Sequence, residues 1–296
     1  TVEVKVANIT LGDVAAVNIT VITGATGNVT ITIGDEFNKT VGVSDGVISV
    51  IVPGMTVGDK TVNVTYNGND ETSEETVEVK FEVAKADPTI TVEVKDIVYG
   101  EIEYIIIKSN AEGTVNVTVN GKTVEVPTNS HTVLRASMWD IPTYNGEATV
   151  EVPNLAVGKY PVEVTFNGND NYNMLTTNAV FNVVKANSTI NIETQSSSKV
   201  GDTQVINITV DNANATGKVI VNVGGENHTV NITNGFGQLK IDNIAGGNYK
   251  INAFYEGDGN LTGSWASMDF EVEKLDADIN INITNSTAGN KQIIEV

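Results

Sequence analysis

Apolar and polar residues alternate along most of this chain, in short runs separated by Gly, Asn and Asp. In the run "TVNVTY" at residues 61–66, the side chains of Val62, Val64 and Tyr66 point to one side of an extended backbone, and those between them point to the other. A shift of one residue would bury Asn and expose Val, so the alternation fixes the register. No long run has helical spacing, and the pattern therefore predicts an all-β protein.

The alternating runs recur in three blocks. One strand aligns all three, reading "GNVTITI" from residue 27, "GTVNVTV" from residue 113 and "GKVIVNV" from residue 217. It is followed by "NGK" at residues 120–122 in the second block and by "GGEN" at residues 224–227 in the third. Asn-Gly between alternating strands indicates a tight hairpin, because both turn residues need positive φ. About seven short strands per block predict a two-sheet antiparallel β-sandwich.

The joints between the blocks are short. They read "VAKADPTITV" from residue 83, "VVKANSTINI" from residue 183 and "VEKLDADINI" from residue 272. Such joints are too short to act as flexible tethers, and Pro88 stiffens one of them, so we expect an elongated rod. The alignment predicts three modules and the partial start of a fourth, at residues 1–86, 87–187, 188–275 and 276–296.

One loop has almost the same amino-acid sequence in two blocks. The text "VTYNGND" at residues 64–70 returns as "VTFNGND" at residues 164–170, and a looser copy, "AFYEGDG", lies at residues 253–259. Gly supplies backbone freedom in tight turns, and Asn and Asp form hydrogen bonds with their own main chain. We interpret the motif as a turn that each sandwich needs for its construction.

Calcium binding is the alternative function of this loop. Asn69, Asp70, Asn169 and Asp170 offer the oxygen ligands that calcium prefers. However, calcium takes six to eight oxygens, and the spacing here matches no known calcium loop. No other cofactor is expected.

An insertion at residues 128–146 of the second block breaks the repeat. Aromatic and polar residues on a loop of a rigid scaffold are typical of binding sites, and here they could stack on a sugar and bind its hydroxyl groups. The interpretation that we favour is that the apolar residues of the insertion cap the open end of the sandwich. The candidate ligand-binding residues are His131, Arg135, Trp139, Asp140 and Tyr144.

The composition of the chain argues against several classes of function. The net charge is −20, and the 17 basic residues are not clustered, which excludes nucleic acid and disfavours anionic membrane surfaces. No segment is apolar for long enough to insert into a membrane. With two His, no Cys and no catalytic motif, the chain is not expected to be an enzyme, and we assign no catalytic residues.

Sequons for N-glycosylation are dense, and an outward Asn in a strand leaves its amide in solvent, where a glycan would fit. The candidate acceptors are Asn8, Asn18, Asn28, Asn38, Asn63, Asn116, Asn187, Asn207, Asn214, Asn227, Asn231, Asn260, Asn282 and Asn285.

The second block is similar to a known family. The text "GKYPVEVTFNGNDNY" at residues 158–172 resembles the group 3 bacterial Ig-like domain, which is repeated in tandem in surface proteins of bacteria and in adhesin-like proteins of methanogenic archaea. The first block departs from the pattern, with Thr61 where the second has Tyr160, and the third lacks the closing Tyr. The matching residues are Gly158, Tyr160, Val162, Val164, Phe166, Gly168, Asp170 and Tyr172.

The resemblance implies immunoglobulin-like sandwiches in an extracellular, cell-surface glycoprotein, without catalytic residues or a defined ligand. We expect a semi-rigid stalk that takes part in cell adhesion, whose partners are neighbouring repeats and a glycan or protein of another cell. One alternative is a carbohydrate-binding module that uses the insertion, and another is an accessory region of an extracellular wall-acting enzyme. We interpret the chain as a fragment of a longer protein, with residues 276–296 docked on another part and Trp265 packed at a joint.

Overall fold

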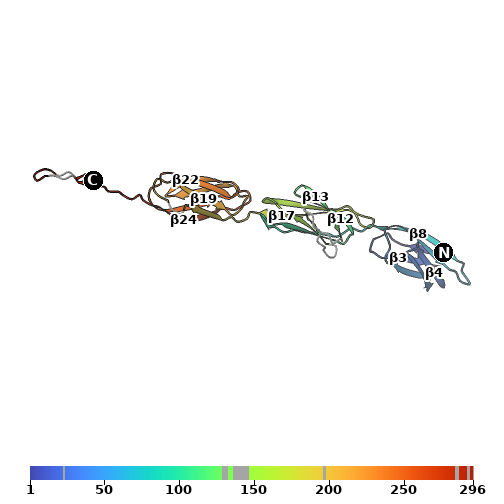
Figure 1. The fold of residues 1–296 in the computed structure, drawn as a ribbon. Helices are drawn as coiled ribbons and strands as arrows, with labels where there is room; N and C mark the ends of the chain where they lie inside the picture. Colours follow the sequence, from blue (N-terminus) through green and yellow to red (C-terminus); the bar gives the residue numbers. More distant parts are fainter. Residues whose placement is uncertain are drawn as a thin grey trace. The chain divides into compact units, whose positions relative to one another are not determined.

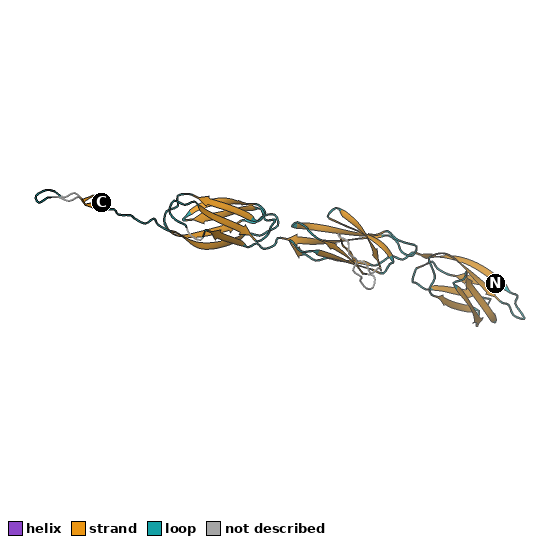
Figure 2. Cartoon of the chain, viewed as in Figure 1, coloured by secondary structure: helices purple, strands orange, loops and turns teal. Residues whose placement is uncertain are grey.

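The structure is a computed structural model that describes residues 1–22, 24–128, 133–135, 147–195, 198–283, 287–291 and 294–295. Figure 1 shows the strands of the fold coloured along the sequence. Contacts divide the chain into two compact units. The first contains Thr1–Ile97, Ile102–Pro153 and Lys159–Asn182, and the second contains Val98–Glu101, Asn154–Gly158 and Val183–Val296. The described residues form strands and loops without a helix, as Figure 2 shows. The described part of the chain thus has no helix long and apolar enough to cross a membrane.

The first block lies in the first unit and forms two facing sheets. One has the order β1-β3-β6 and the other β2-β8-β7-β4-β5. Neighbouring strands are antiparallel, except that β2 runs parallel to β8. The strands are β1 (Glu3–Lys5), β2 (Ile9–Thr10), β3 (Ala15–Thr20), β4 (Gly27–Ile33), β5 (Phe37–Val43), β6 (Val47–Val52), β7 (Gly58–Tyr66) and β8 (Glu75–Ala84).

Alternation along β4 and β7 builds the core of this block. Val62, Val64 and Tyr66 of β7 are buried against Val29 and Ile31 of β4, while the residues between them are partly exposed. Burying one such aliphatic side chain stabilises the fold by about 1.5–3 kcal/mol. The register predicted from the sequence is confirmed.

The second block repeats this arrangement. Its sheets have the orders β10-β17-β16-β12-β13 and β14-β15-β11-β9, and β14 pairs with β15 in parallel. Asn120 and Gly121 have φ of 50° and 69° between β12 and β13, which confirms the predicted hairpin. The strands are β9 (Ile90–Glu93), β10 (Ile97–Val98), β11 (Glu103–Ser109), β12 (Gly113–Val119), β13 (Lys122–Thr128), β14 (Val133–Arg135), β15 (Glu147–Val152), β16 (Gly158–Phe166) and β17 (Leu175–Val184).

The third block lies in the second unit. Its sheets have the orders β18-β19-β22 and β21-β20-β23-β24. Its strands are β18 (Ile190–Thr194), β19 (Gln204–Val210), β20 (Gly217–Val223), β21 (Glu226–Ile232), β22 (Phe236–Ile241), β23 (Gly247–Tyr255) and β24 (Ser264–Val272), and after them come β25 (Asn282–Ile283) and β26 (Ile294–Glu295).

The chain is therefore a tandem array of immunoglobulin-like β-sandwiches. Each large sheet draws its strands from one predicted module, whereas the two compact units do not follow the predicted boundaries. The boundaries at residues 86–87 and 187–188 stay predictions.

Two expectations about the third block and the tail are wrong. Trp265 is 76% exposed, because it takes an outward position of β24, opposite Phe254 of β23. Leu275, Ile279 and Ile281 are also exposed, and β25 pairs only with β26 among the described strands. Two short strands cannot bury an apolar face, so the tail is not docked through these side chains.

Candidate functional site: the repeated turn and the module joints

The repeated Asn of the NGND motif closes a tight turn. The Asn69 Oδ1 atom accepts hydrogen bonds from the backbone N–H groups of Glu71 and Thr72, at 2.8 and 2.7 Å. Its Nδ2 atom donates to the carbonyl of Thr26 at 3.2 Å, which ties the turn to the residue before β4. The side chain thus substitutes for main-chain partners that an irregular loop lacks.

The other two copies use the same geometry. Asn169 accepts bonds of 2.8 Å from the second and third residues after it. In the third copy Asp258 takes this place, and its Oδ1 atom accepts from Asn260 and Leu261 at 2.8 Å. Its Oδ2 atom accepts from the N–H of Thr216 at 3.0 Å. The sequence motif is therefore a structural turn in all three blocks.

Substituting a carboxylate for the amide introduces a titrating group. Burial alone would raise the pKa of Asp258, but the N–H groups of Thr216, Asn260 and Leu261 hold that pKa below its usual value. Burial, with the charge of Asp258, raises the pKa of Tyr255 to about 12. The Tyr255 hydroxyl donates to the carbonyl of Thr216 at 2.6 Å.

Each turn also needs its Gly. Gly68, Gly168 and Gly257 have φ of 72°, 82° and 85°, a region that side chains disfavour. A Cβ atom on Gly257 would lie 2.6 Å from the carbonyl oxygen of Leu261, which is a severe overlap.

Two of the oxygen atoms that were predicted to bind calcium already accept hydrogen bonds. The Oδ1 atoms of Asn69 and Asn169 each accept two backbone hydrogen bonds, while Asp70 and Asp170 are exposed beside them. Within the described ranges, no three His, Cys, Asp or Glu side chains gather closely enough to hold a metal ion. Calcium binding stays a prediction.

The joint between the first two blocks is bound to the second turn. The Ala86 N–H donates to the carbonyl of Asn171 at 3.0 Å, and the Ala86 carbonyl accepts from the N–H of Asn173 at 2.9 Å. The Lys85 Nζ atom donates to the carbonyl of Asn169 at 2.6 Å. Ala86 thereby forms a parallel bridge with Tyr172.

The next joint repeats these contacts. The Ala186 N–H donates to Asn260 at 3.0 Å and its carbonyl accepts from Thr262 at 2.8 Å. The Lys185 Nζ atom donates to the carbonyl of Asp258 at 2.5 Å. The turn therefore holds the Lys-Ala dipeptide of the preceding joint, and we call this pair of residues the Lys-Ala clip. The only sequence signal for it was "KA" in both joints.

The clip leaves the joint without a free residue. The Ala84 carbonyl accepts from the N–H of Leu11 in the first block at 2.9 Å, and the next residue, Lys85, already contacts the second block. In the second unit, the Val184 carbonyl accepts from Tyr99 at 2.8 Å, directly before Lys185.

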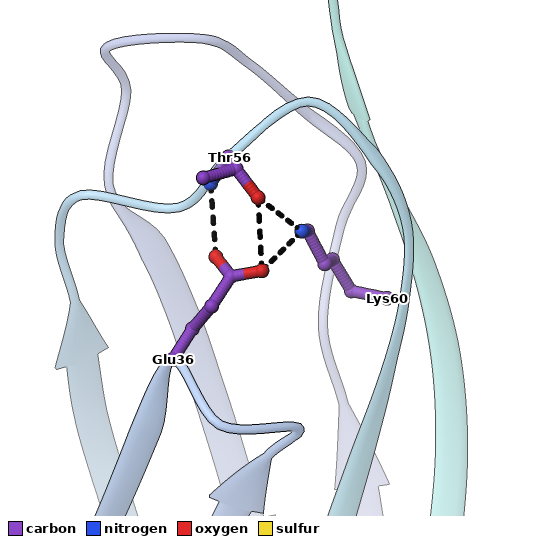
Figure 3. Close-up of polar contacts among 3 residues, drawn as sticks. All are labelled: Glu36, Thr56 and Lys60. Carbon is purple, nitrogen blue, oxygen red and sulfur yellow. Dashed lines mark hydrogen bonds and ion pairs between the residues drawn. The ribbon is translucent and has the colours of Figure 1, made fainter.

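The first block has a polar cluster that sequence reasoning missed (Figure 3). Glu36, in the turn between β4 and β5, accepts bonds of 2.9 Å from the N–H and the hydroxyl of Thr56, and it forms an ion pair with Lys60. Burial raises the pKa of Glu36, but the hydrogen bonds from Lys60 and Thr56 and the charge of Lys60 lower it below its usual value.

The strand register shows which residue of the second block corresponds to Lys60 of the first. β7 and β16 both have nine residues and both begin with Gly, so Lys60 corresponds to Tyr160, and the assignment of Thr61 to that position is wrong. Tyr160 stacks on Phe181 with ring centroids 5.4 Å apart, and Tyr249 stacks on Phe270 at 5.3 Å. Matching letters without the strand register caused the error.

Glu103 is a buried carboxylate of the second block. It is 1% exposed at the start of β11, where it accepts the N–H of Lys95 at 2.7 Å. Burial raises the pKa of Glu103, and the nearby charge of Asp96 adds to that rise.

The candidate residues of the insertion are mostly outside the described part of the chain. His131, Trp139, Asp140 and Tyr144 are not described, and of Arg135 only the backbone is described, in β14. Their role in carbohydrate binding stays a prediction.

The described candidate acceptors for N-glycosylation are exposed or partly exposed, whereas Asn282 and Asn285 lie outside the described side chains. Asn260 accepts the N–H of Val157 at 3.0 Å through its side chain, so its amide is engaged near the second joint. Glycosylation stays a prediction.

Comparison with known proteins finds similarity only among solved structures. No family model matches the chain, and no curated protein matches it. The chain is similar to the fibronectin(III)-like modules of Clostridium thermocellum CbhA, with 13% identity over 65% of this chain and 99% of that one, at a TM-score of 0.27. It is also similar to the mouse nectin-like molecule 4 ectodomain (Ig1–Ig3), with 14% identity, 93% and 99% coverage and a TM-score of 0.30.

A third similar structure is dimeric latent PorU from Porphyromonas gingivalis, with 13% identity over 93% of this chain, 34% coverage of that chain and a TM-score of 0.26. The chain thus spans about a third of PorU. At these scores the similarities carry no argument about function. The immunoglobulin-like assignment is therefore argued from the paired sheets and their strand order.

Proposed function

We propose that this chain is a spacer: a semi-rigid stalk of immunoglobulin-like modules in an extracellular, adhesin-like surface protein. The neighbouring repeats are its first partners, and a glycan or protein on another cell is the partner of the region that it carries. This function needs stable modules and stiff joints, and it needs no catalytic residue or cofactor.

The observation that supports the proposal is the Lys-Ala clip at both joints. A flexible tether needs several residues that are free to rotate. Here the residue before the clip, Ala84 or Val184, is bound by the preceding block. The next residue, the Lys of the clip, is bound by the turn of the following block. Rotation at the joint therefore requires that hydrogen bonds break, and each contributes about 0.5–1.5 kcal/mol.

Distance distributions between spin labels test the joint. The chain has no Cys, so Lys39→Cys and Lys122→Cys place one label in each of the first two blocks, both at exposed positions. We expect a narrow distribution in double electron–electron resonance. Lys85→Met removes the clip's side-chain donor to Asn169 and should broaden it.

Lys159→Met is the matched control, because Lys159 is an exposed Lys in β16, outside the joint. It should leave the distribution unchanged. A broad distribution in the parent protein, equal to that of Lys85→Met, would contradict a stiff joint and with it the spacer function.

A further inference from the structure

The outer faces of the large sheets carry a polar cross-strand pair in the first two blocks. Thr65 of β7 lies opposite Thr76 of β8, and their side-chain oxygens form a hydrogen bond of 2.9 Å. Thr165 of β16 and Thr176 of β17 form the same contact at 3.0 Å. All four side chains are exposed or partly exposed, so both sandwiches fold with a polar pair at this place.

The third block has two aromatic residues at this place. The strands β7, β16 and β23 each have nine residues and begin with Gly, and their eighth residues are Thr65, Thr165 and Phe254. Phe254 lies opposite Trp265 of β24, and the two side chains are 50% and 76% exposed. Ile220 of β20, on the other side of Phe254, is partly exposed and extends what we call the apolar row: Ile220, Phe254 and Trp265. Because the other two blocks fold with Thr at the positions of the two rings, the sandwich does not need the rings for its core.

The apolar row lies in the interior of the described chain. Phe254 and Trp265 are near the ends of β23 and β24 that adjoin the 256–263 turn, which holds Ala186 of the preceding joint. The chain continues after β24 from the opposite end of that strand. The exposure of the two rings therefore belongs to the third block itself.

A row of neutral polar side chains runs beside the apolar row. Asn222, Asn252 and Ser267 take the outward positions two residues along β20, β23 and β24. The Asn222 Nδ2 atom donates to the Asn227 Oδ1 atom of β21 at 2.7 Å, which orients both amides on this face. Amides and hydroxyls donate and accept hydrogen bonds, and neither row contains a charged residue.

We propose that this face of the third block binds a neutral polysaccharide. One face of a pyranose ring presents C–H groups, which pack on an aromatic ring, and its edge presents hydroxyl groups, which donate and accept hydrogen bonds. The apolar row supplies the rings, and the polar row supplies hydrogen-bonding groups roughly 7 Å away along the strands, at ~3.4 Å per residue. Aromatic groups beside a few placed polar groups are typical of sites for small polar ligands.

The size and charge of the face favour this ligand over a protein partner. At about 200–250 Å² for a whole side chain, the exposed fractions of Phe254 and Trp265 amount to roughly 300 Å². A stable protein interface buries about 800 Å² on each partner, and it is steered by complementary charges that the two rows lack. A linear neutral ligand needs only the two rings and the adjacent amides.

Native electrophoresis of the full chain, produced without glycosylation, tests the proposal in gels that contain a neutral polysaccharide. The probes are laminarin, hydroxyethylcellulose and galactomannan, each compared with a gel without polysaccharide. We expect at least one of them to retard the parent chain. The double variant Phe254→Thr/Trp265→Thr copies the polar pair of the first two blocks, so it should fold, which urea unfolding checks. Its affinity, from retardation against polysaccharide concentration, should be at least tenfold weaker.

Phe236→Thr is the matched control, because Phe236 is 48% exposed on β22, in the opposite sheet of the same block. It should be retarded as the parent chain is. Asn252→Ala keeps both rings but removes one amide of the polar row, and it should weaken binding less than the double variant does.

Four results would overturn the proposal. They are no retardation of the parent chain by any of the three probes, equal retardation of the parent and the double variant, an equal loss in Phe236→Thr, and a dimer of the parent chain in sedimentation that the double variant does not form. The second result would place binding elsewhere, as in the insertion at residues 128–146, and the fourth would assign the face to a second copy. The proposal does not rest on the spacer function, because a stiff joint needs no ligand.

Discussion

One residue in the repeated turn makes a single block sensitive to acid. Asn69 and Asn169 do not titrate, whereas Asp258 at the same position is ionised and accepts three backbone N–H groups. The pKa of Asp258 is lowered in the folded state. It therefore contributes stability above its unfolded pKa of about 3.9, and this stability is lost as the pH falls through the lower folded pKa.

The variant Asp258→Asn tests this at residue scale. An amide can keep the Oδ1 bonds to Asn260 and Leu261, but its NH₂ group would face the N–H of Thr216 and could not accept from it. We expect a cost of about 1–3 kcal/mol at neutral pH. Hydrogen exchange of β23 should then show little further loss of protection in acid, and an unchanged acid response would contradict this account.

The Gly of the third turn gives a second prediction at this scale. Gly257→Ala places a Cβ atom 2.6 Å from the carbonyl oxygen of Leu261, at a φ of 85°. A positive φ alone costs a side-chain-bearing residue about 1–2 kcal/mol, and the overlap adds to it. Urea unfolding should show a loss of at least about 2 kcal/mol.

The matched control lies two residues away. Gly259 has no atom within 4 Å of a Cβ placed on it, and its φ is not in the positive range. Gly259→Ala should therefore change stability by less than about 0.5 kcal/mol. Equal losses of stability for the two variants would contradict the assignment of the cost to the backbone conformation and close packing of Gly257.

At the scale of strands, one position differs among the three blocks in a way that predicts a stabilising change. Ala15, Glu103 and Gln204 each begin the strand that pairs with β6, β15 or β22. The raised pKa of Glu103 means that folding favours its neutral form. The ionised form therefore lowers stability once the pH exceeds the unfolded pKa, and more acidic solution relieves this cost.

The variant Glu103→Gln should stabilise the second block at neutral pH, by the ~0.5–2 kcal/mol usual for stabilising substitutions. The Gln Oε1 atom can still accept the N–H of Lys95, and Gln is the residue that the third block has at this position. Glu125→Gln, on the exposed side of β13, is the control and should have no effect. A destabilised Glu103→Gln would mean that the charge itself is needed.

The predicted strands and the observed ones agree where alternation is strict. β4, β12 and β20 begin and end at the residues that the repeat alignment gives, because Val and Ile at every second position fix both face and register. The clip could not be derived in this way, since its bonds join backbone groups of distant residues. Only the Lys of "KA" gives a side-chain signal, and an exposed Lys is common.

At the scale of the whole molecule, the charge of −20 opposes folding in every block at once. Like charges repel within the compact state, and salt screens them over about 10 Å at 0.1 M. We therefore expect the melting temperature to rise as sodium chloride is added at low ionic strength. Exposed ion pairs among the described residues, such as Lys108 with Glu93, contribute little stability, so screening them with salt should not offset this rise.

Specific binding of calcium can be separated from charge screening by comparing calcium and magnesium chloride at equal ionic strength. Screening predicts that calcium and magnesium chloride raise the melting temperature equally, because both ions carry the same charge. A site at Asp70 or Asp170 would add a rise for calcium alone, since calcium accepts irregular oxygen ligands and magnesium demands octahedral geometry. Asp70→Asn and Asp170→Asn should then remove that additional rise. Equal curves for the two ions would leave the repeated turn with its structural role, which is to close each sandwich and, in the second and third blocks, to hold the joint that precedes it.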